Sequence, residues 1–451
     1  MIKIIFNQIW NQRRMNGWIF IELLAVSFFL WVVLDPVCVL TATKNIAPGY
    51  EKEGRMVVRL TKYEETNPRY DAEAEKNDSM KVAHYERVAR IIRDLPEVES
   101  LTIPMQMSFP GSGNWSGMTL YRDTADVAKN ESVHLQWYAF VEGSNPFATY
   151  GMKSVHTGRY LNPEEGIKGV YISENLALEL FGTNDVVGKK VQQTRNIENG
   201  LTIAGVFEDY KHYEYQQPYP LLIYFQKEIE ASPYMHWRYP FVFKLKEGVN
   251  EETFKKRFIS EVVPQLSWGN LRFHSINSFS DAIKDMNEMD GINNKIRLNY
   301  ALAGFAVLCI FLGMLGTFWI RSNARRQEIG VMRSMGASRQ RIVLQFLTEA
   351  TLLVTMAFVC ALPLLLHYAY VEGMYETGFT GSNPIISSMY WVNNFWEHFC
   401  MVSLITYLIL LLIALVGTII PVKRAANVLP ADALFLLSVC LPECIAGALP
   451  S

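Results

Sequence analysis

The stretch LNYALAGFAVLCIFLGMLGTFWI occupies residues 298–320, and RSNARRQEIGVMRSMGASRQRI follows it at 321–342. The first stretch is longer than about 20 residues and has no charged side chain. As a helix that rises about 1.5 Å per residue, it is long enough to cross a hydrocarbon core of about 30 Å. The second stretch is rich in arginine, which membrane proteins retain on the cytoplasmic side. Residues 298–320 are therefore predicted to form a membrane helix that ends in the cytoplasm.

Three further apolar stretches predict membrane helices at 17–40, 345–368 and 398–422. The first and second of these each have a carboxylate near one end, Glu22 and Glu349. Such a carboxylate reaches the lipid headgroups or faces another helix, because a charge facing lipid tails is costly. The expected fold is an α-helical membrane protein with four transmembrane helices and a large α+β extracytoplasmic domain inserted between the first and second.

The distribution of Lys and Arg predicts the orientation. The loop 321–344 is arginine-rich, whereas 369–397 has no Lys or Arg and three Glu, so the first is placed in the cytoplasm and the second outside. Both termini are then cytoplasmic, and the first span is a retained anchor because no small-residue cleavage site follows it. The expected segments are an amphipathic cytoplasmic helix at 1–16, a membrane helix at 17–40, an extracytoplasmic domain at 41–297, a membrane helix at 298–320, a cytoplasmic coupling loop at 321–344, a membrane helix at 345–368, an extracytoplasmic loop at 369–397, a membrane helix at 398–422 and a cytoplasmic tail at 423–451.

Two of these segments leave an alternative open. Residues 1–16 either lie on the membrane surface as an amphipathic helix or form a frayed polar terminus. The apolar part of the tail, 435–451, is short and contains Pro442 and Glu443, so it is either an interfacial segment or an altered end.

Composition agrees with a membrane protein that has a sizeable soluble part, since 50% of residues are hydrophobic and 19% are charged. A formal net charge of -2 provides no basic surplus for neutralising phosphates, which argues against nucleic acid as a partner. All six cysteines lie outside 41–297, so that region is no disulfide scaffold. Cys440 and Cys444 have no second pair or histidine beside them to complete a zinc site.

Region 41–297 mixes the periodicities of strands and helices. Strands are expected at 56–61, 132–141, 169–172, 201–207, 221–225 and 241–245. Helices are expected at 79–95, at 174–181 with Ser173 as N-cap and Gly182 at the C-terminal end, and at 278–297 as a rigid stalk that runs straight into the second span. This mixture predicts an α+β domain.

The loop at 321–344 contains a short helix with an apolar stripe. Ile329, Met332 and Met335 lie three residues apart, Gly336 is placed to end the helix, and Ser338 is placed to cap the next one. Such a helix can insert into a groove on a partner. The alternative is an ordinary arginine-rich loop that only sets membrane topology.

Three groups of motifs resemble the FtsX-like, or MacB-type, permeases of ABC systems. The first consists of Glu328-Ile329-Gly330, Arg333, Gly336-Ala337-Ser338, Gln345-Phe346-Leu347 and Glu349-Ala350. The second is similar to the MacB-like periplasmic core and consists of Gly158-Arg159-Tyr160, Val170 to Glu174, Ala177, Leu180-Phe181-Gly182, Val187-Gly188-Lys189 and Ile203 to Phe207. The third, Pro421 to Ala426 with Pro430 to Leu434, is similar to the C-terminal end of that family.

The resemblance implies that the helix between the second and third spans docks on an ATPase subunit. The residues it assigns to that contact are Arg325, Glu328, Ile329, Gly330, Met332, Arg333, Met335, Gly336, Ala337, Ser338 and Arg339. ATP-driven closure of two ATPases would then move the external domains. No GxxxxGK[ST] loop occurs in the chain, so the ATPase is expected to be a separate protein.

The sequence indicates no catalytic residue, cofactor site or metal site in this chain. Its eight histidines are scattered, and neither a Gly-x-Ser-x-Gly nor an HExxH motif occurs. The polar and aromatic loop at 209–215 is either a contact loop for a partner or a solvated loop whose aromatic rings fold onto the core.

The function implied by the resemblance is that of a permease subunit in the bacterial inner membrane, with its large domain in the periplasm. It would transmit motion from a separate ATPase to efflux or export peptides, small toxic compounds or lipoproteins. Its expected partners are that ATPase, a second permease copy or homologous permease, membrane lipid and, in efflux, a periplasmic adaptor and an outer-membrane channel. The alternative is a membrane-anchored sensor, or an assembly or cell-wall-regulating factor, without transport.

Overall fold

The computed structural model describes residues 13–106, 108–112, 116–193, 200–232, 234–376 and 390–426. Most of the predicted amphipathic helix at 1–16 and of the predicted tail at 423–451 lies outside the described residues. The chain divides into two compact units. The helical unit comprises Met1–Val39, Lys295–Glu376 and Phe395–Ser451, and the inserted domain comprises Leu40–Asn294 and Thr377–Asn394.

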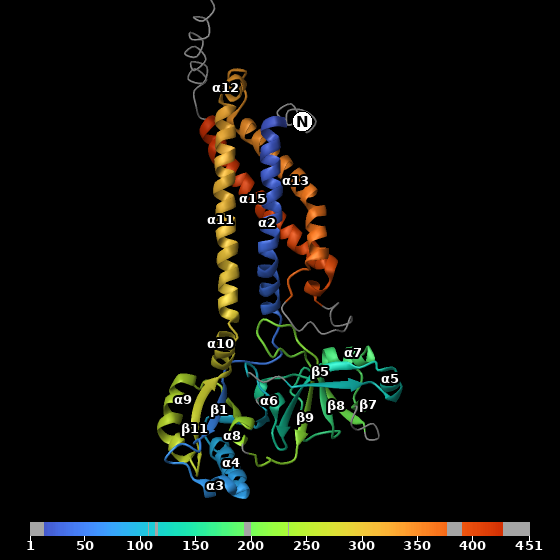
Figure 1. The fold of residues 1–451 in the computed structure, drawn as a ribbon, viewed down its shortest axis with the longest axis vertical. Helices are drawn as coiled ribbons and strands as arrows, with labels where there is room; N and C mark the ends of the chain where they lie inside the picture. Colours follow the sequence, from blue (N-terminus) through green and yellow to red (C-terminus); the bar gives the residue numbers. More distant parts are fainter. Residues whose placement is uncertain are drawn as a thin grey trace, which may run out of the picture. The chain divides into compact units, whose positions relative to one another are not determined.

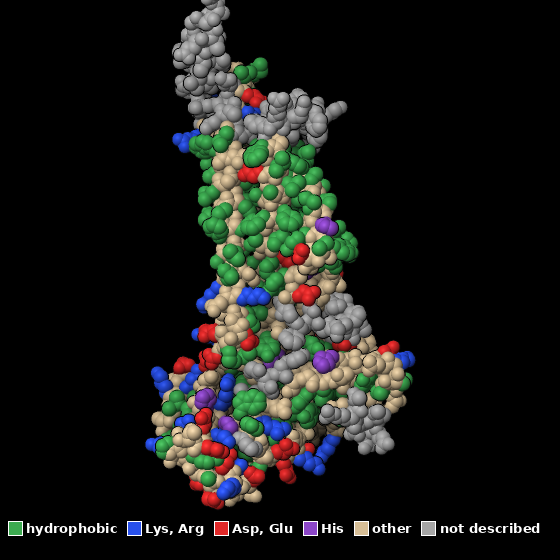
Figure 2. Space-filling model, in the orientation of Figure 1, with side chains coloured by type: hydrophobic (Ala, Val, Ile, Leu, Met, Phe, Trp, Pro, Cys, Tyr) green, Lys and Arg blue, Asp and Glu red, His purple; other side chains and the backbone are tan. Residues whose placement is uncertain are grey.

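Among its described residues, the helical unit contains four long helices and one short one. They are α2 (Arg13–Asn45), α11 (Ile292–Ala324), α12 (Arg326–Ser334), α13 (Arg339–Val371) and α15 (Phe395–Ala426). Each of the four long helices contains a stretch long and apolar enough to cross a membrane, which confirms the predicted four-helix architecture. In Figure 2, hydrophobic side chains cover most of the visible face of these helices, whereas charged side chains gather on the inserted domain.

Close packing holds the interior of the helical unit together. Val354 and Ala357 of α13 and Leu410 and Ala414 of α15 are fully buried in one shared cluster, to which α2 and α11 also contribute. At Gly417 of α15, an added methyl group would lie 3.7 Å from the α11 backbone. Small residues at such crossings matter in lipid, where helices associate through van der Waals contact and not through exclusion of water.

Polar side chains inside the helical unit pair with one another. Thr317 of α11 donates a hydrogen bond to the Glu22 carboxylate of α2 at 3.1 Å. Trp31 Nε1 of α2 donates to Ser403 Oγ of α15 at 3.1 Å. Glu22 therefore faces another helix, one of the two arrangements expected from the sequence.

A four-stranded antiparallel sheet in the order β11-β1-β10-β2 forms one part of the inserted domain. The strands are β1 (Arg55–Lys62), β2 (Val98–Thr102), β10 (Phe241–Leu245) and β11 (Leu271–Ser278). The accompanying helices are α3 (Ala72–Lys76), α4 (Asp78–Arg93), α8 (Met235–Arg238) and α9 (Glu251–Arg257), and α9 is followed by the turns Phe258–Val262 and Val263–Gln265. Met56 and Val58 of β1 pack with Tyr85 of α4, whereas Val57 packs in a second core with Phe279. Because both faces of β1 are covered here, Met56, Val57 and Val58 form an apolar run without alternation.

The second sheet closes on itself. Its order is β3-β5-β4-β7-β8-β6-β9, and β5 also pairs with β9, so six of its strands form a ring. The strands are β3 (Pro104–Met105), β4 (Gly117–Tyr121), β5 (Val133–Val141), β6 (Val170–Ser173), β7 (Lys190–Gln193), β8 (Leu201–Phe207) and β9 (Leu221–Gln226). Leu120, Leu135, Ile172 and Ile203 fill the ring as a fully buried cluster. So few strands leave room inside only for side chains.

Short helices complete the inserted domain (Figure 1). They are α5 (Thr124–Lys129), α6 (Pro146–Tyr150), α7 (Glu174–Phe181), α10 (Phe279–Met289) and the turn Trp391–Asn393. Leu176 and Leu180 of α7 pack into the cluster that fills the ring. The predicted strands at 201–207 and 241–245 and the predicted helix at 174–181 have the same bounds in the structure.

Two local predictions are wrong. The helix expected over 278–297 is interrupted: α10 ends at Met289, Gly291 adopts a left-handed conformation (φ 67°), and α11 starts at Ile292. Glycine tolerates that conformation, so no continuous stalk forms. Ser173 precedes α7, but its hydroxyl donates to Asn175 Oδ1 and does not cap the helix. Asp209 instead accepts the Asn175 N–H at 2.8 Å and takes over that role.

Candidate functional site

Helix α12 lies at one end of the helical unit, between α11 and α13 (Figure 1). It ends as predicted: Gly336 has a φ of 87°, and the Ala337 N–H donates to the Met332 carbonyl at 3.0 Å. Ser338 Oγ accepts the Arg341 N–H at 3.2 Å and caps α13, which confirms the second predicted boundary. These two devices set the length and the end points of the short helix.

The predicted apolar stripe of α12 is divided between two environments. Ile329 is 2% exposed and packs against Ile342 and Phe346 of α13 and Val422 of α15. Met332 is partly buried against the same cluster, whereas Met335 is 82% exposed. Ile329 therefore holds α12 to its own bundle, and a contact of the stripe with a partner stays a prediction.

Arg325, which immediately precedes α12, joins it to α13. Its guanidinium donates from Nε and Nη2 to both carboxylate oxygens of Glu328, at 2.7 and 2.9 Å, and from Nη1 to Glu349 at 2.6 Å. It also lies over the Phe346 ring, 4.6 Å from the ring centroid. Arg325 is 4% exposed and Glu349 is 1% exposed. Glu349 therefore faces another element of the protein and not the headgroups.

Arg325 keeps its positive charge despite its burial. Desolvation alone would lower the pKa of this guanidinium, but the hydrogen bonds to Glu328 and the charge of Glu349 together raise that pKa above its ordinary value. A two-point fork on one carboxylate and a single bond to another fixes the direction of the guanidinium plane. Arg325 and Glu328 were expected to contact an ATPase, and the structure places them in this internal ion-pair cluster.

The remaining predicted contact residues differ in how far they are exposed on α12 and the turn that follows it. Gly330 is buried and Arg333 and Ala337 are half-buried, whereas Gly336, Ser338 and Arg339 are exposed. Val331, which the sequence did not single out, is 43% exposed. The outward face of this segment thus combines two apolar side chains, Val331 and Met335, with an exposed arginine, Arg339.

The loop at 209–215 in the inserted domain folds onto the core. Tyr210 and His212 are buried, and the two ring nitrogens of His212 contact Tyr138 Oη and the Ser112 carbonyl, the latter at 3.1 Å. Burial lowers the pKa of His212 from 6.5 to about 4. Lys211 is also buried, and its ammonium donates to the Thr43 carbonyl at 2.7 Å. Tyr210 therefore folds onto the core, which agrees with the second interpretation of this loop from the sequence.

Acid should destabilise the inserted domain through His212. The folded-state pKa of about 4 is below the ordinary 6.5, so between these values the unfolded chain takes up a proton that the folded chain does not. Stability falls as pH falls through this window, by up to about 3 kcal/mol at about 1.4 kcal/mol per pKa unit. Chemical unfolding of the wild type and of His212→Asn, measured from pH 7 to pH 4, should show the stability difference between them shrink by that amount.

The comparison with a variant is needed because Asp209 acts in the opposite direction. Burial raises the pKa of this carboxyl to about 6, so acidification through that value favours the folded state. Asp209 is present in both proteins and cancels in the difference. His134→Asn, at an exposed histidine of the same domain, is the control and should keep the wild-type profile. A constant difference between wild type and His212→Asn would contradict the prediction.

One polar cluster in the helical unit was not found from the sequence. Asp35 of α2 accepts from His398 Nε2 of α15 at 2.6 Å and from the Tyr375 N–H at 2.8 Å. Asp35 is 5% and His398 is 1% exposed. Both residues lie at ends of predicted spans, where polar residues are common, so only their pairing across the chain would have distinguished them.

Comparisons with known proteins agree with this architecture. The family model described as FtsX-like permease C-terminal matches residues 300–430. Two proteins named macrolide export ATP-binding/permease protein MacB, from Campylobacter jejuni serotypes O:2 and O:23/36, are 23% and 24% identical over 338 residues. Each match covers 70% of this chain and 46% of the relative, so the chain spans about half the length of the curated relatives it matches.

Solved structures of external domains also align with the chain. The periplasmic region of MacB from Actinobacillus actinomycetemcomitans aligns at 15% identity and a TM-score of 0.31, over 55% of this chain and 97% of that one. The extracellular domain of the ABC-type transporter YknZ from Gram-positive bacteria aligns at 11% identity and a TM-score of 0.27, over 49% of this chain and all of that one.

The family match covers most of α11 and all of α12, α13 and α15. These elements contain the Glu328-Ile329-Gly330, Gly336-Ala337-Ser338 and Glu349-Ala350 motifs. The alignment with the two MacB proteins is longer and covers 70% of this chain. The chain has four helices long and apolar enough to cross a membrane, with an α+β domain inserted between the first and second. Residues 300–430 therefore match the FtsX-like permease C-terminal family, and the chain as a whole is similar to MacB-type permeases.

Proposed function

We propose that this permease works as the membrane subunit of an ABC system in the bacterial inner membrane, and that α12 is its contact with a separate ATPase in the cytoplasm. In this proposal both termini are cytoplasmic and the inserted domain is in the periplasm. ATP-driven motion of the ATPase moves α12, and the membrane helices pass that motion to the inserted domain. A second copy of the chain, or a homologous permease, completes the membrane part.

The observation that supports this proposal most directly is the division of α12 into an anchored face and a free face. Ile329 and Arg325 fix the helix to α13 and α15, so a force applied to α12 acts on the membrane helices. Val331 and Met335 remain exposed beside Arg339. A flexible apolar side chain such as Met335 suits insertion into a groove on a partner.

The cargo proposed is a peptide, a small toxic compound or a lipoprotein that is exported or released outside the inner membrane. The two Campylobacter relatives are named as macrolide exporters. Efflux would further require a periplasmic adaptor and an outer-membrane channel as partners.

Replacing Val331 and Met335 together with Asp should weaken ATPase binding at least about 10-fold, because two carboxylates would enter an apolar contact without partners. The measurement is copurification with, and affinity for, the ATPase that copurifies with the wild-type chain. Met80→Asp is the matched control, since Met80 is an exposed methionine of the inserted domain. Wild-type ATPase affinity in the double variant, with its unfolding midpoint unchanged, would count against α12 as the contact.

Ile329 is unsuitable for this test although it belongs to the predicted stripe. Its side chain is buried against Ile342, Phe346 and Val422, so Ile329→Asp would place a carboxylate inside the protein itself. Loss of ATPase binding in that variant would report misfolding at α12 and not a lost contact.

A further inference from the structure

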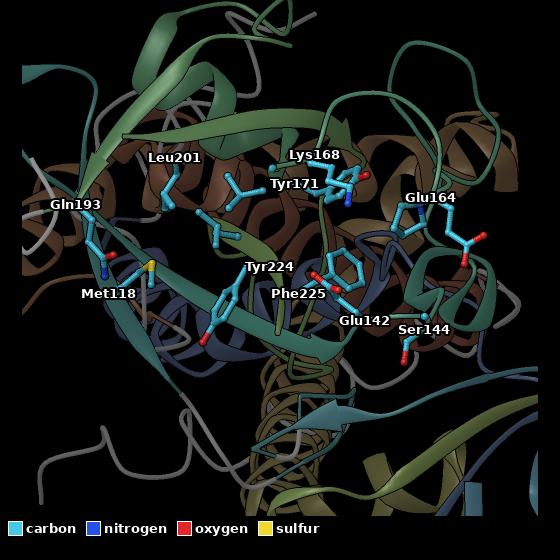
Figure 3. A pocket seen from close by; sticks show the side chains of 15 residues that line it. Met118, Glu142, Ser144, Glu164, Lys168, Tyr171, Gln193, Leu201, Tyr224 and Phe225 are labelled. Atoms are coloured by element: carbon cyan, nitrogen blue, oxygen red, sulfur yellow. The ribbon is translucent and has the colours of Figure 1, made fainter. Parts of the chain in front are cut away.

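A cavity of about 830 Å³ opens in the inserted domain where the six-stranded ring ends (Figure 3). Its apolar wall includes Met118, Leu201, Tyr224, Val170 and Leu222. These residues come from β4, β8, β9 and β6, so four different strands of the ring contribute to one wall. A volume of this size is typical of pockets that hold a drug-sized molecule.

Strand alternation shows that this wall continues the inside of the ring. Met118 is two residues from Leu120, Leu201 two from Ile203, and Tyr224 two from Leu222, so each pair shares one face of its strand. The inner member of each pair is fully buried, whereas Met118, Leu201 and Tyr224 are half-buried. The ring interior is already filled by side chains, and the cavity is therefore its mouth.

The end of the ring that carries the cavity is the one away from α7. Val170 is the first residue of β6 and lines the cavity, whereas α7 follows directly on the last residue of that strand. The aromatic ring of Tyr224 is held by Trp137, with centroids 5.3 Å apart. A fixed aromatic side chain loses little conformational freedom when a ligand packs against it.

The polar groups of the cavity lie at its two ends. Figure 3 shows Gln193 beside Met118 at one end and Glu142, Glu164 and Lys168 toward the other. Within the described part of the chain, Gln193 has no side-chain hydrogen bond, and the three charged side chains have no ion pair within 4.0 Å. A carboxamide that offers both a donor and an acceptor matches a peptide group. Two carboxylates against one ammonium favour a positively charged ligand.

We propose that the mouth of this ring binds a short free peptide with apolar side chains and a positive charge. The apolar side chains pack on Met118, Leu201 and Tyr224, the Gln193 carboxamide pairs with the peptide backbone, and the charge lies against Glu142 and Glu164. This assignment rests on the proposed function in placing the domain in the periplasm, and it narrows the proposed cargo to a class of peptide.

The test uses the full chain in lipid nanodiscs without ATP or ATPase. The probe is the synthetic tripeptide amide Leu-Phe-Lys, titrated by calorimetry with empty nanodiscs as the blank. Saturable binding is expected, with affinity at least about 10-fold weaker for Ser-Gly-Lys amide, which lacks the apolar groups, and about 5-fold weaker for acetyl-Leu-Phe-Glu, which carries negative charge.

Two variants locate the binding. Met118→Trp fills the mouth and should weaken binding at least about 10-fold, and the double variant Glu142→Gln with Glu164→Gln should weaken it about 5-fold, as expected for two exposed carboxylates. Glu165→Gln is the matched control, because Glu165 is an exposed carboxylate of the same loop that bonds to Asn162 and does not line the cavity. Its affinity should equal that of the wild type.

The proposal is overturned if no probe binds saturably, or if Met118→Trp binds with wild-type affinity. It is also overturned if the double glutamine variant and the acetylated probe show no loss, since the preference for positive charge then has another origin. The glutamine substitutions lie on the surface and leave the fold intact, which the unfolding midpoint checks. Because no ATPase is present in this assay, its failure and the failure of α12 as an ATPase contact are separate results.

Discussion

Replacing Glu349 with Ala should lower the free energy of unfolding of the permease by about 3 kcal/mol or more. The substitution leaves the Arg325 guanidinium, 4% exposed, without the carboxylate that lies 2.6 Å from it. Removing one partner of a buried ion pair typically costs about 3–5 kcal/mol. Arg325 keeps the partly exposed Glu328 carboxylate, so a loss at the low end of this range is expected. Chemical unfolding of the purified chain in detergent micelles measures the loss.

Two further variants separate this pair from general damage to the helix. Glu328→Ala removes a carboxylate whose side chain is 33% exposed, and the loss should be clearly smaller, since water can replace it. Arg325→Met combined with Glu349→Leu removes both charges and should recover much of the stability lost in Glu349→Ala. Equal losses in Glu349→Ala and Glu328→Ala would contradict the assignment of Glu349 as the buried partner.

Asp35→Ala should have an effect of similar size in the helical unit. The Asp35 carboxylate accepts from His398 at 2.6 Å and from the Tyr375 backbone at 2.8 Å, so the substitution removes the acceptor shared by a buried side chain and a part-buried N–H. Losing the acceptor of a buried polar group costs about 1–3 kcal/mol, so a total of about 3 kcal/mol is expected. The same unfolding experiment in micelles tests it.

The two histidines near this part of the unit provide a matched pair for the same experiment. His398 is 1% exposed, whereas His367 is exposed. His398→Ala should therefore destabilise the chain by about the same amount as Asp35→Ala, and the double variant should lose little more than either single variant. His367→Ala should be close to the wild type. Additive losses for Asp35 and His398 would show that the two residues act independently.

Together these two clusters connect different helices of the helical unit. Arg325 and Glu349 join α12 to α13, and Asp35 joins α2 to α15 and to the residues after α13. A buried ion pair adds little net stability compared with a well-packed apolar pair, so what it contributes here is one defined arrangement of the helices.

Much of the fold could be read directly from the chain. The four membrane helices were predictable because transfer into lipid depends on the composition of about 20 consecutive residues, as at 298–320. The ends of α12 and the start of α13 were equally local, since Gly336 and Ser338 act within their own turn of backbone. The strand at 241–245 and the helix at 174–181 followed from periodicity.

The candidate site was predictable in position but not in orientation. Ile329 and Met335 are six residues apart, and at 3.6 residues per turn their side chains point about 120° apart around the helix axis. The two side chains therefore lie at opposite edges of one broad stripe. Which edge faces inward depends on where α13 and α15 lie. Their Ile342, Phe346 and Val422 enclose Ile329 and leave Met335 outside.

The sequence by itself thus determined the membrane helices, the inserted α+β domain and the short arginine-rich helix, because each depends on contacts within one segment. The tertiary structure alone decided that Arg325 binds Glu349, that Asp35 meets His398, and that β5 pairs with β9 to close a ring. Those partners lie far apart in the chain, and no local preference specifies them. They are selected by packing, since a buried charge or an unpaired strand edge is stable only where the rest of the fold supplies its partner.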